Sequence, residues 1–176
     1  MSDFDTNGLL HWIATGGGQR AWSNPHTQGL VKVTASSYYS GSGHATYGEQ
    51  HFVNREASAT MFMSLSAPNS WVMVDLGAAN AVRPSRYTLR TRGDGDCFHL
   101  RHWRLEGSED GQQWTALRSH ANDSALTGAN GTASWAVEGA ARAFRYLRVL
   151  MTGKCSHNYD HLFVNGLEVY GVVEQQ

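Results

Sequence analysis

The residues best suited to chemistry lie in two stretches of the sequence. Cys97 precedes His99, and Cys155 precedes His157, so each stretch holds a thiol and an imidazole two positions apart. Thiolates and imidazoles bind zinc, but neither stretch has the Cys-x2-4-Cys spacing that is typical of structural zinc sites. Three alternatives remain: a zinc site, a Cys97–Cys155 disulfide and two unpaired thiols. We favour the unpaired thiols because an intracellular compartment keeps thiols reduced.

A nucleophile, a base and an acid also follow one another in the second stretch, at Cys155, His157 and Asp160. A catalytic triad requires a base within hydrogen-bond reach of the nucleophile and a third group that holds the base. Closeness in sequence within a flexible loop provides neither. We therefore predict that the chain is not an enzyme and that these side chains face solvent.

Three arginines form a second cluster of candidate residues. Arg90 and Arg92 are two residues apart, so their side chains lie on the same face of an expected strand. Arg101 lies at the start of the next expected strand. The planar guanidinium suits carboxylates, phosphates or sugar hydroxyls. The alternative is internal pairing, of Arg90 with an acid across the sheet and of Arg92 with Asp94 or Asp96.

The composition is that of one folded domain. The chain has 176 residues, with 14 Lys and Arg against 15 Asp and Glu and a formal net charge of −1. Aromatic residues make up 11% of it and charged residues 16%, whereas a disordered chain carries few aromatics and much charge. Because no basic block is present, we expect no nucleic-acid partner. No linker or repeat divides residues 1–176, so we expect a single domain.

The sequence also bears on the compartment. No apolar run approaches the ~20 residues of a membrane-spanning helix, and residues 1–8 lack the basic and apolar parts of a signal peptide. We expect a cytoplasmic protein, either complete or a domain of a longer one. The sequons at Asn122 and Asn130 would carry glycans only if the protein were exported.

Short runs rich in β-branched and aromatic residues recur between clusters of Gly, Asn, Asp and Ser, which is typical of all-β proteins. In one run, Leu147, Val149 and Met151 point to the same face by alternation. Asp110-Gly111 supplies the positive φ of a tight hairpin turn between two others. The number of runs indicates a sandwich or barrel. The expected strands are residues 30–36, 61–65, 71–76, 86–91, 102–107, 114–118, 134–137, 144–151 and 166–172.

The order of these segments resembles a discoidin domain, also called coagulation-factor type C, of the galactose-binding-like jelly rolls. The resemblance covers residues 30–171, and the opening segments 7–15 and 22–25 further resemble the branch found in intracellular HECT-type ubiquitin ligases and BTB proteins. It implies an all-β, single-domain antiparallel sandwich that binds ligands through loops and does no chemistry. The matching segments are Ser70-Trp-Val-Met-Val-Asp-Leu-Gly77, Tyr87-Thr-Leu-Arg90, residues 103–115, Phe144-Arg-Tyr-Leu-Arg-Val149 and Gly166-Leu-Glu-Val-Tyr-Gly171.

If consecutive strands run antiparallel, as in a jelly roll, four connections share one end of the sandwich, which we call the loop end. The connections at the opposite end, residues 78–85 and 108–113, are short and look structural. The four connections of the loop end are residues 37–70, 92–101, 119–133 and 152–165. They carry both cysteines and most of the histidines, namely His44, His51, His99, His120, His157 and His161.

We expect the loop end to recognise a protein or peptide partner, with a glycan-binding, lectin-like module as the alternative. Discoidin relatives bind glycans, anionic phospholipids, collagen or other proteins, so the resemblance alone does not decide. For a glycan, Tyr47 or Tyr159 would stack on a sugar ring while polar side chains bind its hydroxyls. The predicted ligand-binding residues are Arg90, Arg92, His99, Arg101, Lys154, Asn158, Tyr159 and Tyr47.

Three further expectations concern the core, membranes and ions. Trp71, Trp103 and Trp114 are expected in the core. A membrane partner is not expected because residues 38–43 are polar, although Leu162-Phe163 would be a possible wedge. The resemblance raises a structural calcium ion at Glu168, but residues 37–60 lack the acids that such a cation prefers. We therefore expect no cofactor and keep calcium as the open alternative.

Overall fold

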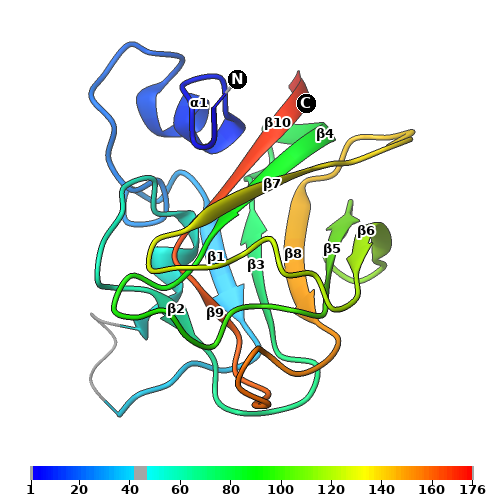
Figure 1. The fold of residues 1–176 in the computed structure, drawn as a ribbon. Coiled ribbons are helices and arrows are strands. Elements are labelled where there is room, and N and C mark those ends of the chain that lie inside the picture. Colours follow the sequence, from blue (N-terminus) through cyan, green and yellow to red (C-terminus); the bar gives the residue numbers. More distant parts are fainter. Residues whose placement is uncertain (1, 42–46, 176) are drawn as a thin grey trace.

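The computed structural model, which describes residues 2–41 and 47–175, consists of two antiparallel sheets packed face to face (Figure 1). The large sheet has the order β1-β3-β8-β5-β6, the small sheet has the order β10-β4-β7, and β2 pairs with β9. The prediction of an all-β antiparallel sandwich is confirmed. The elements are α1 (Leu9–Thr15), β1 (Lys32–Ala35), the 3-10 helix η1 (Glu49–Val53), β2 (Phe62–Met63), β3 (Trp71–Asp75), β4 (Asn80–Arg90), β5 (Trp103–Ser108), β6 (Thr115–His120), β7 (Thr132–Ala136), β8 (Tyr146–Met151), β9 (Phe163–Val164) and β10 (Leu167–Gln175).

All nine expected strands are present near their predicted ranges, but one boundary is wrong. The segment 78–85 is not merely a connection, because β4 begins at Asn80 and its first half pairs with residues 171–175 of β10. The strand is hard to recognise in the sequence because it contains Pro84 and Arg83. A register shift between Tyr170 and Gly171 of β10 accommodates the proline. The elements α1, η1 and β9 were not expected.

Strand alternation fills the space between the sheets. Val72 and Val74 of β3 and Leu147 and Val149 of β8 are fully buried there, each contributing about 1.5–3 kcal/mol by leaving water. The hairpin at Asp110-Gly111 is confirmed: Gly111 has φ 75°, and Asp110 Oδ1 accepts the backbone N–H groups of residues 112 and 113, both at 2.8 Å.

Of the three tryptophans expected in the core, only Trp103 is buried there. Trp71 is partly exposed because it alternates with Val72 and so faces away from the small sheet. Trp114 is also partly exposed, and its ring packs 4.0 Å from the guanidinium carbon of Arg148. Trp135 of β7 is partly buried and packs against the core, with its ring centroid 5.2 Å from that of Trp103.

A polar network inside the core joins the two sheets. Trp103 Nε1 of the large sheet donates to the hydroxyl of Tyr87 in the small sheet at 3.0 Å. That hydroxyl lies 2.6 Å from His120 Nε2, and His120 Nδ1 lies 2.7 Å from Asp123 Oδ2. The hydroxyl therefore donates to Nε2, which places the imidazole proton on Nδ1. Burial lowers the pKa of His120, although Asp123 opposes the shift, so the ring is neutral near pH 7.

Strand directions place the four predicted connections at one end, opposite the two chain termini (Figure 1). Neighbouring backbones there are hydrogen-bonded across these connections: the N–H of Tyr39 donates to Met63 O at 2.8 Å, and that of Ser64 donates to Leu162 O at 3.1 Å. The predicted loop end is therefore confirmed as an arrangement of the chain. His44 lies outside the described residues.

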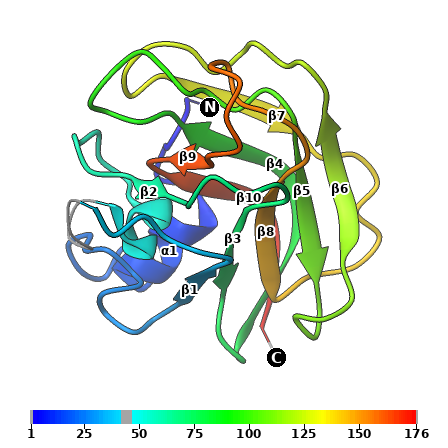
Figure 2. The same ribbon diagram turned by 90° about the horizontal axis from the view of Figure 1, so that it is seen from below.

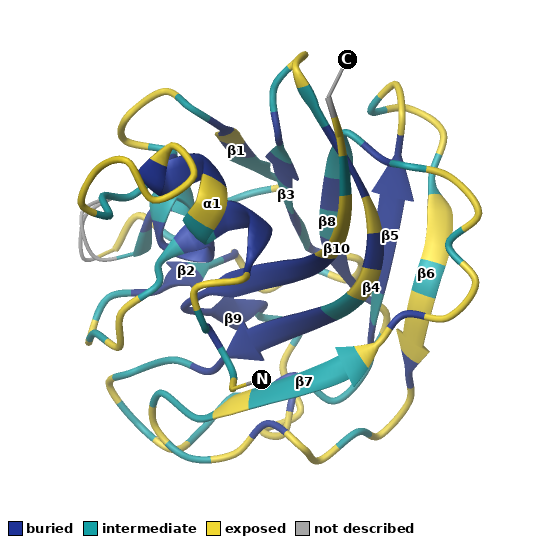
Figure 3. Ribbon diagram, turned by 90° about the horizontal axis from the view of Figure 1, so that it is seen from above, coloured by how far each residue is buried: buried dark blue, intermediate teal, exposed yellow. Residues whose placement is uncertain are grey.

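The N-terminal segment covers the outer face of the small sheet, beside β10 (Figure 3). Asp3 pairs with Arg86 at 2.8 Å, and the ring of Phe4 lies 4.0 Å from the guanidinium carbon of Arg90. The carboxylate of Glu168, only 2% exposed, accepts the N–H groups of residues 10 and 11 at 2.8 and 3.1 Å. Because Gly8 provides no side-chain cap, Glu168 supplies the acceptors that the first turn of α1 needs.

We expect Tyr87→Phe to lower the free energy of unfolding by about 2 kcal/mol, because His120 Nε2 and Trp103 Nε1 would lose their shared partner while staying buried. Urea unfolding at pH 7.5 measures this. Tyr146→Phe is the matched control, since Tyr146 is partly exposed on the outer side of β8, and it should change stability by less than about 0.5 kcal/mol. Equal effects of the two variants would contradict a specific role for the Tyr87 hydroxyl.

Burial raises the pKa of Glu168 to about 7, although the amides of Val169, Leu10 and His11 oppose the shift. Between its ordinary pKa and 7, the folded state binds more protons than the unfolded state, so this group destabilises the fold as pH rises. Relative to Glu168→Gln, the wild type should lose about 3 kcal/mol between pH 4.5 and 8 in urea unfolding. The exposed Glu109→Gln control should follow the wild type. If the wild type instead became more stable relative to Glu168→Gln as the pH rises, the folded state would favour the ionised carboxylate.

Candidate functional site

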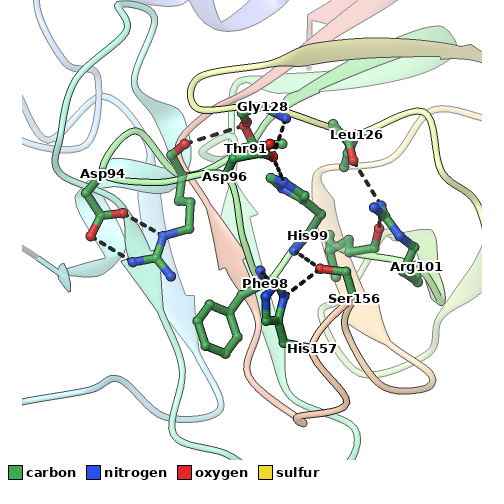
Figure 4. A network of polar contacts seen from close by, with 12 residues as sticks. Thr91, Asp94, Asp96, Phe98, His99, Arg101, Leu126, Gly128, Ser156 and His157 are labelled. Carbon is green, nitrogen blue, oxygen red and sulfur yellow. Dashed lines mark hydrogen bonds and ion pairs between the residues drawn. The ribbon is translucent and has the colours of Figure 1, made fainter.

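One carboxylate interlocks two connections of the loop end. Asp96 Oδ1 lies 2.7 Å from His99 Nε2 and accepts the N–H of Gly128 at 2.8 Å (Figure 4). The hydrogen bond with His99 and that with Gly128 hold the pKa of Asp96 below its usual value. His99 also exchanges hydrogen bonds with Ser156, its N–H donating to Ser156 Oγ at 3.0 Å. Segments near 96, 128 and 156 are therefore fixed to one another.

Two predicted ligand-binding arginines belong to this framework. Arg101 Nη1 donates to the carbonyls of Leu100 and Leu126, both at 2.9 Å, and so holds the connection after β6 (Figure 4). Arg90 is buried and donates to the carbonyl of Arg55 at 2.6 Å instead of pairing with an acid. His99 is likewise 5% exposed and bonded to Asp96. The ligand-binding role of these three residues stays a prediction.

Buried amides complete the framework. Asn165 is fully buried and donates to Ser58 O at 3.0 Å and to Asn130 Oδ1 at 3.1 Å, while its own Oδ1 accepts from Asn54 at 3.2 Å. Asn130 Oδ1 also accepts the N–H of Ser58 at 3.2 Å. Asn130, the residue of one sequon, is thus partly buried with its Oδ1 engaged, whereas Asn122 of the other sequon is exposed.

Arg92 lies at the boundary between this framework and the surface. Its Nε and Nη2 bond both oxygens of Asp94, at 2.5 and 2.7 Å, which confirms the internal-pairing alternative. The hydrogen bond from Arg92 lowers the pKa of Asp94. The guanidinium carbon also lies 5.3 Å from the ring centre of Phe98 and 4.6 Å from that of Phe163. The guanidinium group of Arg92 is therefore hydrogen-bonded to Asp94 along one edge and packs against the rings of Phe98 and Phe163.

Phe98 is the centre of an aromatic cluster at the loop end. Its ring centroid lies 4.8 Å from His157, 5.7 Å from Tyr159 and 5.1 Å from Phe163. Phe98 has φ 56°, a left-handed conformation that is strained for a bulky residue. The N–H of Phe98 donates to His157 Nδ1 at 3.1 Å, which helps to hold this conformation (Figure 4).

Exposed apolar side chains gather beside this cluster. Tyr38, Leu65 and Tyr159 are 51%, 49% and 52% exposed, and we call them the loop-end patch. Their segments are neighbours, because the N–H of Leu65 donates to Ser37 Oγ at 3.2 Å and that of Ala67 donates to Asp160 O at 3.3 Å. Among the described residues only two other large apolar side chains are exposed, Trp12 at 41% and Val172 at 60%, and both lie away from the loop end.

The remaining predicted residues also lie at this end. Lys154, Asn158 and Tyr159 are exposed, and Lys154 Nζ donates to the carbonyl of Asn158 at 3.2 Å. Tyr47 is partly buried and packs edge-on against Tyr39, with ring centroids 5.5 Å apart. Tyr159 is therefore the one predicted stacking residue with an open face.

The structure forms neither a catalytic triad nor a metal centre in the residues it describes. His157 Nδ1 lies 3.1 Å from Ser156 Oγ, and Cys155 is buried. Neither Cys97 nor Cys155 is in a disulfide. Across residues 2–41 and 47–175, no three His, Cys, Asp or Glu side chains are placed to hold a metal ion.

The residues at Glu168 do not fit a calcium ion. One of its oxygens accepts the N–H groups of Leu10 and Val169, and the other accepts that of His11, at 2.8, 3.0 and 3.1 Å. Three N–H groups directed at a carboxylate occupy the positions that a cation would need.

The two residues considered as a membrane wedge are buried. Leu162 and Phe163, the possible wedge, are 0% and 4% exposed, which corrects that expectation. None of the helices described is long and apolar enough to span a bilayer.

Two residues of this site, Phe98 and Leu65, were missed in the sequence because nothing local marks them. Asp96 was considered only as a partner of Arg92, and its contacts with His99 and Gly128 were not expected. The spacing Asp96-x-x-His99 was available as a signal, since an acid and a histidine three residues apart can pair within a loop, but its contact with Gly128 depends on the folded chain.

Residues 32–163, more than half of the chain, match the F5/8 type C domain family. The chain is 33% identical to the E3 ubiquitin-protein ligase Ufd4 of Drosophila melanogaster, over 97% of this chain and 6% of the ligase. It is 35% identical to the E3 ubiquitin-protein ligase hecd-1 of Caenorhabditis elegans, again over 97% and 6%. A BTB/POZ domain-containing protein of Arabidopsis thaliana is 31% identical over 97% of this chain and 21% of that protein. The chain thus spans a small part of each relative.

Two solved structures show the same fold. The CBM32-5 module of Clostridium perfringens, in complex with GalNAc-β-1,3-galactose, has a TM-score of 0.64 at 14% identity and covers 82% of this chain and 97% of its own. Chitosan-binding module 2 of Paenibacillus sp. IK-5, in complex with chitotriose, has a TM-score of 0.59 at 20% identity, over 81% and 97%. The strand order and the match over residues 32–163 establish that the chain belongs to the F5/8 type C, or discoidin, family.

Proposed function

We propose that the chain is a non-catalytic binding module whose loop end recognises a protein or peptide partner. The observation that carries this proposal is the loop-end patch, because Tyr38, Leu65 and Tyr159 expose apolar surface on neighbouring segments. Exposed apolar and aromatic side chains on a rigid support are the usual anchors of protein interfaces. The similarity to two E3 ubiquitin-protein ligases supports an intracellular setting, where ubiquitin conjugation takes place.

The internal pairing of the arginines favours a peptide over a sugar. A sugar site needs several convergent polar groups that are free to bind hydroxyls. Arg92 is bonded to Asp94, Arg101 to backbone carbonyls, and His99 to Asp96. A peptide can instead bind through apolar contact with Tyr159 and its neighbours.

Glycan binding is the second candidate function. It is favoured by the open face of Tyr159, which could stack on a sugar ring beside the exposed Lys154 and Asn158. Two modules of the same fold were solved with bound sugars.

To test the primary proposal, random twelve-residue peptides are displayed on phage and selected on the wild-type chain. The tightest peptide is then synthesised and titrated by calorimetry. We expect Tyr159→Ser and Leu65→Ser each to weaken its binding at least about tenfold, because both remove central apolar contact.

The matched control is Val172→Ser, which removes an apolar side chain that is 60% exposed away from the loop end, and binding should stay within about twofold. Equal loss in all three variants would contradict recognition at the loop end. A rise of several degrees in the unfolding temperature with 100 mM galactose or N-acetylgalactosamine, lost in Tyr159→Ser, would replace the proposal with the glycan alternative.

We further propose that the module needs no structural calcium, because backbone amides surround Glu168. The unfolding temperature in 5 mM calcium chloride and in 5 mM chelator should agree within about 1 °C, since an ion bound only by the folded state would raise it. A shift that disappears in Glu168→Gln would restore the calcium site.

A further inference from the structure

The outer face of the large sheet is uncovered. The small sheet and α1 lie on the opposite side of it, and Figures 1 and 2 show no helix or strand of the described chain over this face. The paired registers place one continuous row across it, from Thr34 through Met73, Arg148 and Glu106. It is distinct from the loop end, which consists of connections between strands.

The carboxylates of this face lie beneath its cations. Glu106 accepts a hydrogen bond from Arg148 at 2.6 Å and forms an ion pair with Arg104 at 3.1 Å, and its side chain is 5% exposed against 42% for Arg104. Asp75 is paired with Arg145 at 2.7 Å, and the two side chains are 17% and 32% exposed. Each carboxylate is thus neutralised below the surface, and the groups that meet solvent are positive.

Two cations on this face are not required to neutralise the charges of Asp75 and Glu106. Lys32 stands in register with Asp75, which already has Arg145, and Lys32 is exposed. Arg104 shares Glu106 with Arg148, and within the described chain its terminal nitrogens make no hydrogen bond. The face therefore carries an excess of two positive charges on a chain whose formal charge is −1.

Apolar surface lies between Lys32 and Arg104. Trp71 and Met73 of β3 and Tyr146 of β8 are partly exposed on this face. Three strand spacings of ~4.8 Å and four residues of ~3.3 Å separate the two cations, which gives a diagonal of about 20 Å. An extended peptide covers this distance in about six residues.

We propose that this face is a second interaction surface, which takes an acidic peptide segment in extended conformation. Two carboxylates about six residues apart meet Lys32 and Arg104, and the apolar side chains between them, on the same face of the peptide, pack on Trp71 and Met73. Charge complementarity sets the orientation of the peptide, and the apolar contact supplies the rest of the affinity. The proposal is independent of the partner at the loop end.

The probe is the fluorescein-labelled peptide Glu-Thr-Leu-Thr-Leu-Thr-Glu, in which both glutamates and both leucines share one face. Fluorescence anisotropy at 50 mM salt should give a Kd below about 1 mM that weakens at 500 mM salt. The control peptide Glu-Thr-Leu-Glu-Leu-Thr-Thr has the same composition, with its second glutamate on the opposite face, and should bind at least about fivefold more weakly.

Lys32→Glu and Arg104→Glu should each weaken binding of the first peptide about fivefold or more, whereas Arg83→Glu, an equal charge change on the small sheet, should alter it less than about twofold. Lys32→Glu keeps the test valid if Arg104→Glu fails to fold, because Lys32 is exposed. Absence of binding at 1 mM, equal effects of all three variants, loss of binding in Tyr159→Ser, or equal affinity for a seven-nucleotide oligothymidylate would each overturn the proposal.

Discussion

The hydrogen-bonded core around Tyr87 is the interaction on which the rest of the structure depends. Tyr87 comes from the small sheet, while Trp103 and His120 come from the large one, so the sheets can approach only if these polar atoms satisfy one another. An unpaired polar atom at this depth would cost about 1–3 kcal/mol. The same chain of contacts reaches Asp123 in the connection after β6, and so the core also sets where the loop end begins.

The loop end is held rigid by hydrogen bonds among its own polar groups. Asp96, Arg101 and Asn165 each join segments that are far apart in the sequence. Polar side chains bonded in this way are engaged inside the protein, and the exposed remainder includes the apolar loop-end patch beside Lys154 and Asn158. A rigid apolar patch loses little entropy on binding, which is the physical advantage of a sandwich as a recognition module.

The two sheets differ in how their outer faces are used. The N-terminal segment covers the small sheet, where Glu168 caps α1 with a buried carboxylate. The large sheet keeps its outer face open, with carboxylates beneath and cations above. One fold therefore presents an apolar surface at one end and a cationic surface on one side, and these suit different partners.

The sequence by itself determined the all-β class, nine of the strands and the hairpin at Asp110-Gly111, because alternation and turn chemistry act between near neighbours. The gathering of four connections at one end was implied by the resemblance to a discoidin jelly roll. The sequence left open whether Arg92 binds a ligand or Asp94, and it did not reveal α1 or β9. Only the tertiary structure decided these points. The acceptor that caps α1 lies 158 residues from Leu10, and Arg90 and Arg101 are held by carbonyls of distant loops. Contacts of this kind depend on which segments the packed sheets bring together, and no local pattern records them.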